Sequence, residues 1–406
     1  MSTGKDDISG WLVRRSPWPP WLGLVAVLGA LTGHVARATP DGGMDNAIVV
    51  RAARAWLEGR SPYDDPHFLY LPGAVLAAVP QALLPPEVLR VLVPAVVTAC
   101  LVGGWGCALR LHRVPLDSRL AVLGLTALAA GFAPFGHLVR LGNWTATAVL
   151  ALPLGLLLAS RGRWTAAGAV LGTALALKPL LAPLALLFLF AGRWKALAVM
   201  AAVPALASGA SALLLPDPAG FLTRTLPFLL HGQDAFVRLY EASPGAVLPR
   251  LGVPAPAART LALAACAAGL VAAYRRWGRA DPGPLRLSET AAGLMLSVFL
   301  VSRPSYDHYL LVVVPLLLAG LPYPGSVARG RWFWLAMVPQ LPGLTWPYLE
   351  TVQRRAFRDA VTLCVLAVTV ACRCGRRGGA GRRARARGRR SPAAITFTLD
   401  EEKQRS

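Results

Sequence analysis

Charged residues are scarce in this sequence. They make up 15% of its 406 residues, whereas soluble domains carry roughly 25%. The mean hydropathy is +0.50, and long apolar runs recur from Trp21 to Val370. Each run is close to the ~20 residues that a membrane-spanning helix needs. No soluble domain of useful size fits between the runs, so we predict an all-α integral membrane protein.

Acidic residues are particularly few: 20 Asp and Glu stand against 42 Lys and Arg, which gives a net charge of +22. Nine of the arginines fall between residues 373 and 390. We interpret residues 372–406 as a disordered cytoplasmic tail that follows the positive-inside rule and touches anionic membrane lipid. Nucleic-acid binding is the alternative reading of such a charge, and the apolar helices exclude a soluble nucleic-acid binder. We therefore expect no nucleic-acid partner.

Cysteines are few as well, and their placement argues against a zinc-binding protein and against a disulfide-stabilised one. The six cysteines show neither zinc-ligand spacing with histidine nor a disulfide framework. Four of them fall inside apolar runs. The cysteines therefore indicate neither a zinc site nor disulfides, and we expect no cofactor.

The distribution of basic residues between the apolar runs predicts the topology. Residues 1–17 are assigned to the cytoplasm, and 18–371 to a bundle of about twelve transmembrane helices. Both termini are then cytoplasmic, and the long polar loops, about 37–71 and 216–258, lie on the outer face of the plasma membrane. The helical ranges include 18–36, 88–110, 119–138 and 144–160.

Two parts of the first outer region have patterns of their own. Apolar residues form one stripe of 45–58, which is typical of a helix that lies in the membrane interface. Segment 72–84 is bracketed by Pro72 and Pro85 and is too short to span, so it is a half-membrane helix or a helix docked on the protein.

The stretch 171–190 contains one charge, Lys178, in the middle of twenty residues. A lysine at the centre of a bilayer costs at least ~2.5 kcal/mol. Basic segments flank 164–191 on both sides, so the segment must turn back as a hairpin. Because proline disfavours helix at the residue before it, Pro179 predicts an unwound tip at Lys178. The lysine then reaches the outer half of the protein.

The predicted outer face collects carboxylates and cations, which is what transfer of a sugar from a lipid phosphate requires. A carboxylate can take the proton from an attacking hydroxyl, and cations stabilise the charge on a departing phosphate. Asp45 is a candidate catalytic residue, and His308 is a candidate supporting acid or base. Candidate phosphate ligands are Lys178, Arg224 and Arg303. Candidate substrate-binding residues are Asp41, Tyr63, Asp64, His67, Tyr70, Asn143 and Asp307.

Each assignment has a structural alternative. Asp45 precedes an apolar stretch and could cap its helix. Lys178 could snorkel from a helix end. Arg303 and His308 could be interface anchors, Asp64 could belong to a turn, and Arg224 could be an ordinary loop charge.

The stretches "VVRAARAWLEGRSPYDDPHFLYLPG", "LGNW", "ALKPLLAPLALLFLFAGRWKAL" and "SYDHYLLVVVPLLL" resemble glycosyltransferase family 87. These are actinobacterial membrane enzymes of the GT-C class, and the resemblance runs from about residue 40 to 325. "DPHFLYLPG", "LKPLLAPL" and "DPAGFLTRTLPFLL" look closest to the branching arabinofuranosyltransferases. Mannosyltransferases that use polyprenyl-phosphate mannose are the other well-known members.

The resemblance implies a GT-C-type bundle and a metal-independent, inverting transfer on the outer face. The donor would be a polyprenyl-phosphate sugar, arabinofuranose or mannose, and the acceptor a cell-envelope glycan or glycolipid. It makes Asp45 the general base and places Lys178 at the donor phosphate. Asp307 and His308 stand where the family often has a second histidine or a tryptophan, and Leu141 replaces a frequent glutamine.

Two other classes of function compete with the glycosyltransferase. A transporter or flippase of polyprenyl-linked sugars predicts ionisable residues at mid-depth and paired broken helices. The sequence shows one broken hairpin and no partner for it. A lipid-binding scaffold would not need a carboxylate opposite the cations.

Overall fold

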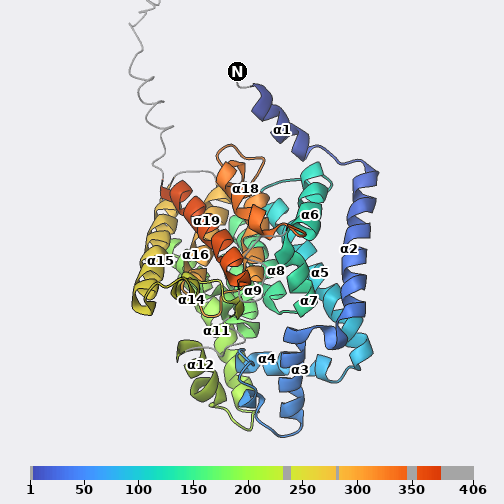
Figure 1. Cartoon of the computed structure of the whole chain (residues 1–406), viewed down its shortest axis with the longest axis vertical. Helices are drawn as coiled ribbons and strands as arrows, with labels where there is room; N and C mark the ends of the chain where they lie inside the picture. The colour runs from blue at the N-terminus through green and yellow to red at the C-terminus, as the bar shows by residue number, and fades with distance from the viewer. Residues whose placement is uncertain (1–2, 232–238, 280–282, 345–353, 376–406) are drawn as a thin grey trace, which may run out of the picture.

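The computed structural model describes residues 3–231, 239–279, 283–344 and 354–375, and within these ranges the chain is helical without a β-strand (Figure 1). The Arg-rich tail after residue 375 lies outside the described residues. The described part confirms the all-helical prediction.

Four helices are long and apolar enough to cross a membrane: α2 (Trp18–Ala38), α5 (Pro86–Leu111), α11 (Trp194–Ala212) and α15 (Ala255–Trp277). Their outward side chains, such as Leu22 on α2 and Leu206 on α11, are more than half exposed. Apolar surface of this extent on adjacent turns belongs in lipid. The structure thus supports a membrane protein.

The number of spans is not settled by length, and twelve stays a prediction. A fifth span arises if α6 (Arg119–Gly131) and α7 (Ala133–Leu141) count as one. The sequence predicts a single helix over 119–138, but the two parts are bent by 71°. Phe132 between them is extended, and Pro134 has no N–H to continue the helix. Other apolar helices are shorter, among them α8 (Thr145–Ser160) and α9 (Trp164–Leu177).

The bundle centre is formed by α8, which packs against α5 and α9, while α9 packs against α11. Glycines allow these close approaches. A Cβ at Gly104 of α5 would lie 2.5 Å from the carbonyl oxygen of Val149 on α8, and one at Gly168 of α9 would lie 2.3 Å from that of Ala196 on α11. Small residues at such contacts let helix backbones pack closely in membranes.

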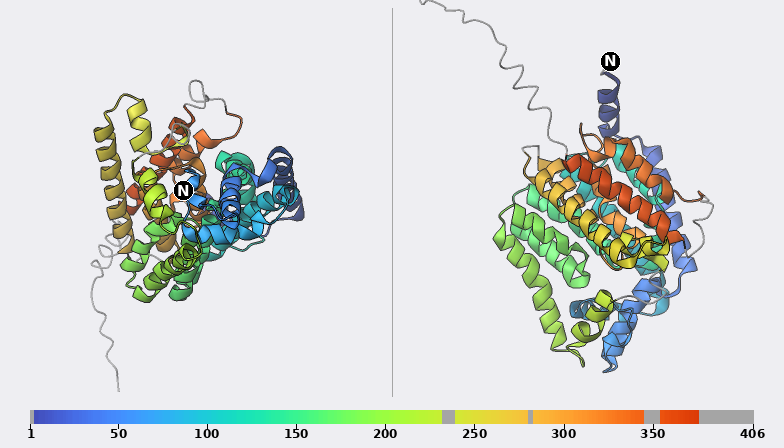
Figure 2. Two further views of the ribbon diagram at one scale, coloured as in Figure 1. Left: turned by 90° about the horizontal axis from the view of Figure 1, so that it is seen from below. Right: turned by 60° about the vertical axis from the view of Figure 1, so that its left-hand side comes forward.

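A second group of helices completes the bundle. Helix α15 packs against α16 (Gly283–Phe299) and α19 (Arg355–Gly375), and α16 packs against α19. The right-hand view of Figure 2 shows these three helices, in yellow to red, running alongside one another. Along the chain, α16 and α19 are separated by five short helical elements: η5 (Asp307–Val312), α17 (Val314–Leu318), η6 (Val327–Arg329), α18 (Arg331–Met337) and η7 (Val338–Gln340).

The two ends of the bundle differ. Helices α3 (Met44–Leu57), α4 (Pro72–Ala82) and α12 (Leu226–His231) gather at one end, and α1 (Thr3–Val13) lies at the other (Figure 1). Helix α4 packs against α3 and α11, in agreement with the docked alternative for 72–84. Its eleven residues span only ~16 Å. That α3 lies in the membrane interface, and that its end faces outward, remain predictions.

The segment 164–191 is interrupted where the sequence predicts it. Helix α9 ends at Leu177, Lys178 is extended (φ −147°, ψ 123°), and η3 (Pro179–Leu184) leads into α10 (Ala185–Phe190). Pro179 has no N–H with which to extend α9. The structure therefore confirms the break at Lys178.

Candidate active site

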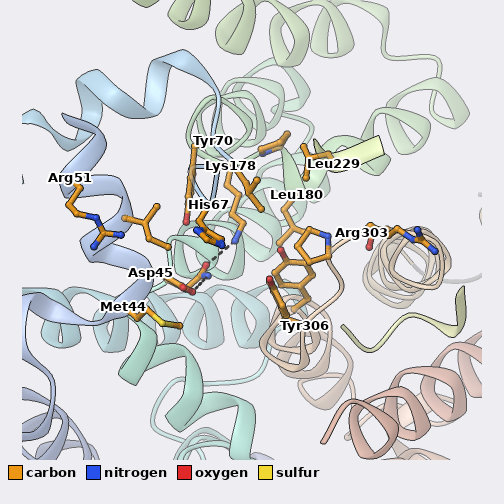
Figure 3. A pocket seen from close by; sticks show the side chains of 17 residues that line it. Met44, Asp45, Arg51, His67, Tyr70, Lys178, Leu180, Leu229, Arg303 and Tyr306 are labelled. Carbon is orange, nitrogen blue, oxygen red and sulfur yellow. Dashed lines mark hydrogen bonds between the residues drawn. The ribbon is translucent and has the colours of Figure 1, made fainter. Parts of the chain in front are cut away.

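A cavity of about 470 Å³ lies beside the first turn of α3 (Figure 3). Its volume is within the range of small-molecule sites. Six distant segments of the chain meet there: α3, the loop before α4, the turn between α7 and α8, the break after α9, α12, and residues 302–309. Of the candidate residues, the lining includes Asp45, His67, Tyr70, Asn143, Lys178 and Arg303.

Asp45 is held at the cavity by the way in which α3 begins. The N-cap is Gly43, and no side chain caps the helix, so the capping role for Asp45 is wrong. Gly43 has φ 108°, and a Cβ there would lie 2.6 Å from the carbonyl oxygen of Arg140. Glycine thus lets the start of α3 touch the end of α7, which brings Asp45 beside Asn143.

Asn143 connects the carboxylate of Asp45 to the ammonium group of Lys178. Its Oδ1 accepts hydrogen bonds from Lys178 Nζ at 3.0 Å and from the Thr145 backbone N–H at 2.7 Å. Because both donors occupy the amide oxygen, the NH₂ group must point the other way. There it donates to Oδ2 of Asp45. Asn143 is 3% exposed, so water does not compete for these bonds.

Lys178 points into the cavity, not along the membrane surface. Its Nζ also donates to Thr145 Oγ1 at 3.0 Å. The ammonium group lies 5.6 Å from the ring centroid of Tyr70 and 5.1 Å from that of Tyr309. Such distances are typical of cation–π contacts. The snorkelling alternative for Lys178 is therefore wrong.

Further basic side chains line the cavity, each with a carboxylate partner. Arg51 Nη2 lies 3.3 Å from Asp65 Oδ2, and His67 Nδ1 lies 3.3 Å from Asp65 Oδ1. Arg303 Nε lies 3.7 Å from Oε1 of Glu241. The sequence analysis did not identify Arg51 as a candidate.

Six candidate residues do not line the cavity, and four of them do not lie directly behind its wall either. Arg224 pairs with Asp64 and, at 3.0 Å, with Asp217. Tyr63 is buried near this group, and burial, with Asp217 nearby, raises the pKa of its hydroxyl. Asp41 is exposed. Their substrate roles remain predictions that the cavity geometry does not support.

Asp307 and His308 are buried directly behind the cavity wall. The His308 ring stacks on Tyr306 at 5.3 Å and meets Tyr309 edge-on at 5.1 Å, and both tyrosines line the cavity. Asp307 accepts the backbone N–H of His308 at 2.7 Å. These two residues thus support the tyrosine wall.

Sequence reasoning missed two partners of Asp307. His137 of α7 and Arg355 at the start of α19 both contact its carboxylate, Arg355 at 3.1 Å. The one signal was a histidine inside an apolar helix, near the end that the topology places outside. Nothing in the sequence indicated that Arg355 would meet it.

The described ranges contain no group of three or more His, Cys, Asp or Glu side chains that could hold a metal ion. What the cavity offers chemically is a carboxylate and an ammonium group joined by one amide, beneath an aromatic wall.

Comparison with known proteins bears on this arrangement. The profile of glycosyltransferase family 87 matches residues 68–302. An α-(1→3)-arabinofuranosyltransferase of Mycobacterium tuberculosis is 30% identical over 342 residues, which cover 80% of this chain and 76% of that protein. The α-(1→3)-arabinofuranosyltransferase of Mycolicibacterium smegmatis is 28% identical over 67% of this chain and 63% of its own length.

The α-(1→3)-arabinofuranosyltransferase of Corynebacterium glutamicum is 26% identical over 67% of this chain and 66% of its own length. No solved structure matches the chain. The profile match covers more than half of the sequence, and the resemblance seen in the motifs is confirmed. The chain belongs to glycosyltransferase family 87 and is a membrane glycosyltransferase.

Proposed function

We propose that this protein transfers arabinofuranose from a polyprenyl-phosphate donor to a glycan or glycolipid of the cell envelope, on the outer face of the plasma membrane. The names of the relatives support the sugar. The observation that carries the proposal is the hydrogen-bonded series Asp45–Asn143–Lys178 in one cavity. It pairs a proton acceptor with a cation, as the reaction requires.

In the proposed reaction an acceptor hydroxyl attacks C1 of the sugar in one displacement. The C1–O bond to the phosphate breaks, a new C1–O bond forms, and the hydroxyl proton passes to Asp45. Oδ2 of Asp45 already accepts a hydrogen bond from the amide of Asn143. Within the described residues no other side chain hydrogen-bonds to the Asp45 carboxylate, so its Oδ1 can take the proton. Attack opposite to the leaving phosphate inverts the configuration at C1.

The departing polyprenyl phosphate gains negative charge as the C1–O bond breaks. Lys178 is oriented for this charge by Asn143 and Thr145 before the substrate arrives. Preorganised cations of this kind stabilise a transition state without reorganising during the reaction. Arg303 provides a second cation on the lining, and its pairing with Glu241 holds it in position.

The apolar part of the lining suits the lipid portion of such a donor. Pro179 and Leu180 follow Lys178 directly and line the cavity. Leu229 of α12 lies beside Leu180 (Figure 3). A donor whose phosphate contacts Lys178 would thus place its first isoprene units against an apolar wall. A soluble nucleotide sugar would gain nothing there.

The test uses the purified protein in lipid nanodiscs with radiolabelled polyprenyl-phosphate arabinose or polyprenyl-phosphate mannose, and envelope glycan acceptors. We expect transfer from the arabinose donor and little from the mannose donor. Preferred transfer from the mannose donor would contradict the sugar assignment. Binding of a donor with no transfer to any acceptor, together with its movement across the membrane, would instead identify a flippase.

A further inference from the structure

A second cavity, of about 440 Å³, lies at the other end of the central helices. Helix α8 begins at Thr145 beside Lys178 and ends at Ser160, which lines this second cavity. Its sixteen residues separate the two sites by ~24 Å. Helix α9 links them in the same way, because Trp164 lines the second cavity and Lys178 follows its last residue. The second cavity therefore belongs to no part of the proposed reaction.

Four arginines from three segments line this cavity. Arg110 and Arg113 lie at the end of α5, Arg161 lies in the turn between α8 and α9, and Arg286 lies on α16. We call them the arginine cluster. None of the lining residues is acidic, and within the described ranges none of the four arginines forms an ion pair with a carboxylate.

Arg286 is the most enclosed member of the cluster. Its guanidinium lies 4.7 Å from the ring centroid of Trp277, and its Nη1 donates to the carbonyl oxygen of Arg279 at 3.5 Å. Its Nε is buried and has no hydrogen-bond partner. A buried N–H without a partner is costly, and for a charged group the cost is larger.

Arg110, Arg113 and Arg161 are exposed, and an anion bound among the four like charges would lower their mutual repulsion. Guanidinium groups recognise phosphate oxygens by paired hydrogen bonds, and several of them can hold more than one phosphate charge. Two tryptophans, Trp164 and Trp277, also line the cavity. Tryptophan is enriched where membrane meets water, and basic pockets between transmembrane helices bind the head groups of polyanionic lipids.

We propose that the arginine cluster binds the phosphate head group of a polyanionic phospholipid in the inner leaflet. The head group would bridge the end of α5, the α8–α9 turn and the start of α16. Occupancy would lower the repulsion among the arginines and so stabilise the fold. The ligand, its place and its role are independent of the sugar transferred at the Asp45 cavity.

The experiment measures lipid binding to the full-length protein by native mass spectrometry and by thermal unfolding in detergent. The probes are cardiolipin, phosphatidylcholine and soluble inositol hexakisphosphate. The variants are Arg161→Gln, Arg113→Gln and the charge-conserving Arg161→Lys. Arg275→Gln is the control, because Arg275 is exposed on α15 near this end but does not line the cavity.

We expect cardiolipin to bind and raise the unfolding temperature, and phosphatidylcholine to do neither. One arginine near an anionic lipid surface is worth about 1 kcal/mol, so each Gln variant should weaken cardiolipin binding about fivefold. Arg161→Lys and Arg275→Gln should change it less than twofold. Gel filtration of each variant shows whether it is folded, and Arg113→Gln replaces Arg161→Gln if the latter aggregates.

Equal cardiolipin binding by wild type and by both Gln variants would overturn the proposal. Binding of inositol hexakisphosphate at the same arginines, with no binding of cardiolipin, would overturn the lipid assignment in favour of a soluble anion. Neither result would bear on sugar transfer, so this proposal can fail while the proposed function stands.

Discussion

Replacing Asn143 with alanine should disable the enzyme while leaving both Asp45 and Lys178 in place. Asn143 makes one hydrogen bond to each of these groups, and each bond to a charged partner is worth ~1.5–3 kcal/mol. Both bonds exist before the substrate binds, so only part of their energy acts in the transition state. A loss of ~2–4 kcal/mol there corresponds to a roughly 30- to 1000-fold lower turnover.

Asn46 provides a matched control for Asn143. It is the residue after Asp45 and is completely buried, and its Oδ1 accepts from Trp144 Nε1 at 3.2 Å, but it does not line the Asp45 cavity. Asn46→Ala should lower stability by ~1–3 kcal/mol with little change in turnover per folded molecule. Asn143→Gln, which keeps an amide, should recover part of the loss.

The assay is sugar transfer in nanodiscs under saturating donor, with the unfolding temperature of each variant measured in parallel. If Asn143→Ala turned over within threefold of wild type, or if Asn46→Ala lost as much activity, the inferred role of Asn143 in positioning Asp45 and Lys178 would be refuted.

Three further predictions concern charged residues. Lys178→Met keeps the length of the side chain but removes its charge, so equilibrium binding of the donor should weaken roughly 10- to 100-fold; unchanged binding would place the phosphate elsewhere. Arg224→Gln should alter transfer less than about threefold, because its ion pairs are half-exposed and such pairs contribute ~0–1 kcal/mol; a hundredfold loss would restore it as a donor ligand. Arg276 Nε lies 2.7 Å from the carboxylate of Glu289, whose side chain is 3% exposed. Arg276→Met should lower stability by ~3–5 kcal/mol, because it leaves this buried carboxylate without its charge partner. Adding Glu289→Leu should recover most of that loss in a thermal unfolding assay, and no recovery would contradict this reasoning.

Local rules of the chain were sufficient to predict some of the site. Pro179 disfavours helix at Lys178 whatever packs around it, so the end of α9 before Lys178 could be predicted from two residues. The length of 72–84 and its flanking prolines likewise excluded a span. Asp45 was identified as a candidate because a carboxylate in that outer loop fits the chemistry, and α3 does bring it to the cavity.

Contacts between distant segments could not be predicted in the same way. Arg224 is of a residue type that often binds phosphate, and the sequence therefore suggested it as a ligand. Only the fold shows that it pairs with Asp64 and Asp217 instead. The partnership of His137 and Arg355 with Asp307 depends on how α7 and α19 pack, and no local pattern encodes that. Hydropathy also predicted one continuous helix over 119–138. It averages over many residues and so does not detect the break before Pro134.

The central claim is that Asp45 removes the proton from the acceptor hydroxyl, and Asp45→Asn tests it most directly. The substitution keeps the size of the side chain but removes its basicity, and general-base catalysis is typically worth ~10²–10⁴-fold. With polyprenyl-phosphate arabinose in nanodiscs, we predict that transfer falls by about that factor while binding of the donor changes less than threefold. Near-normal transfer by Asp45→Asn would contradict the account.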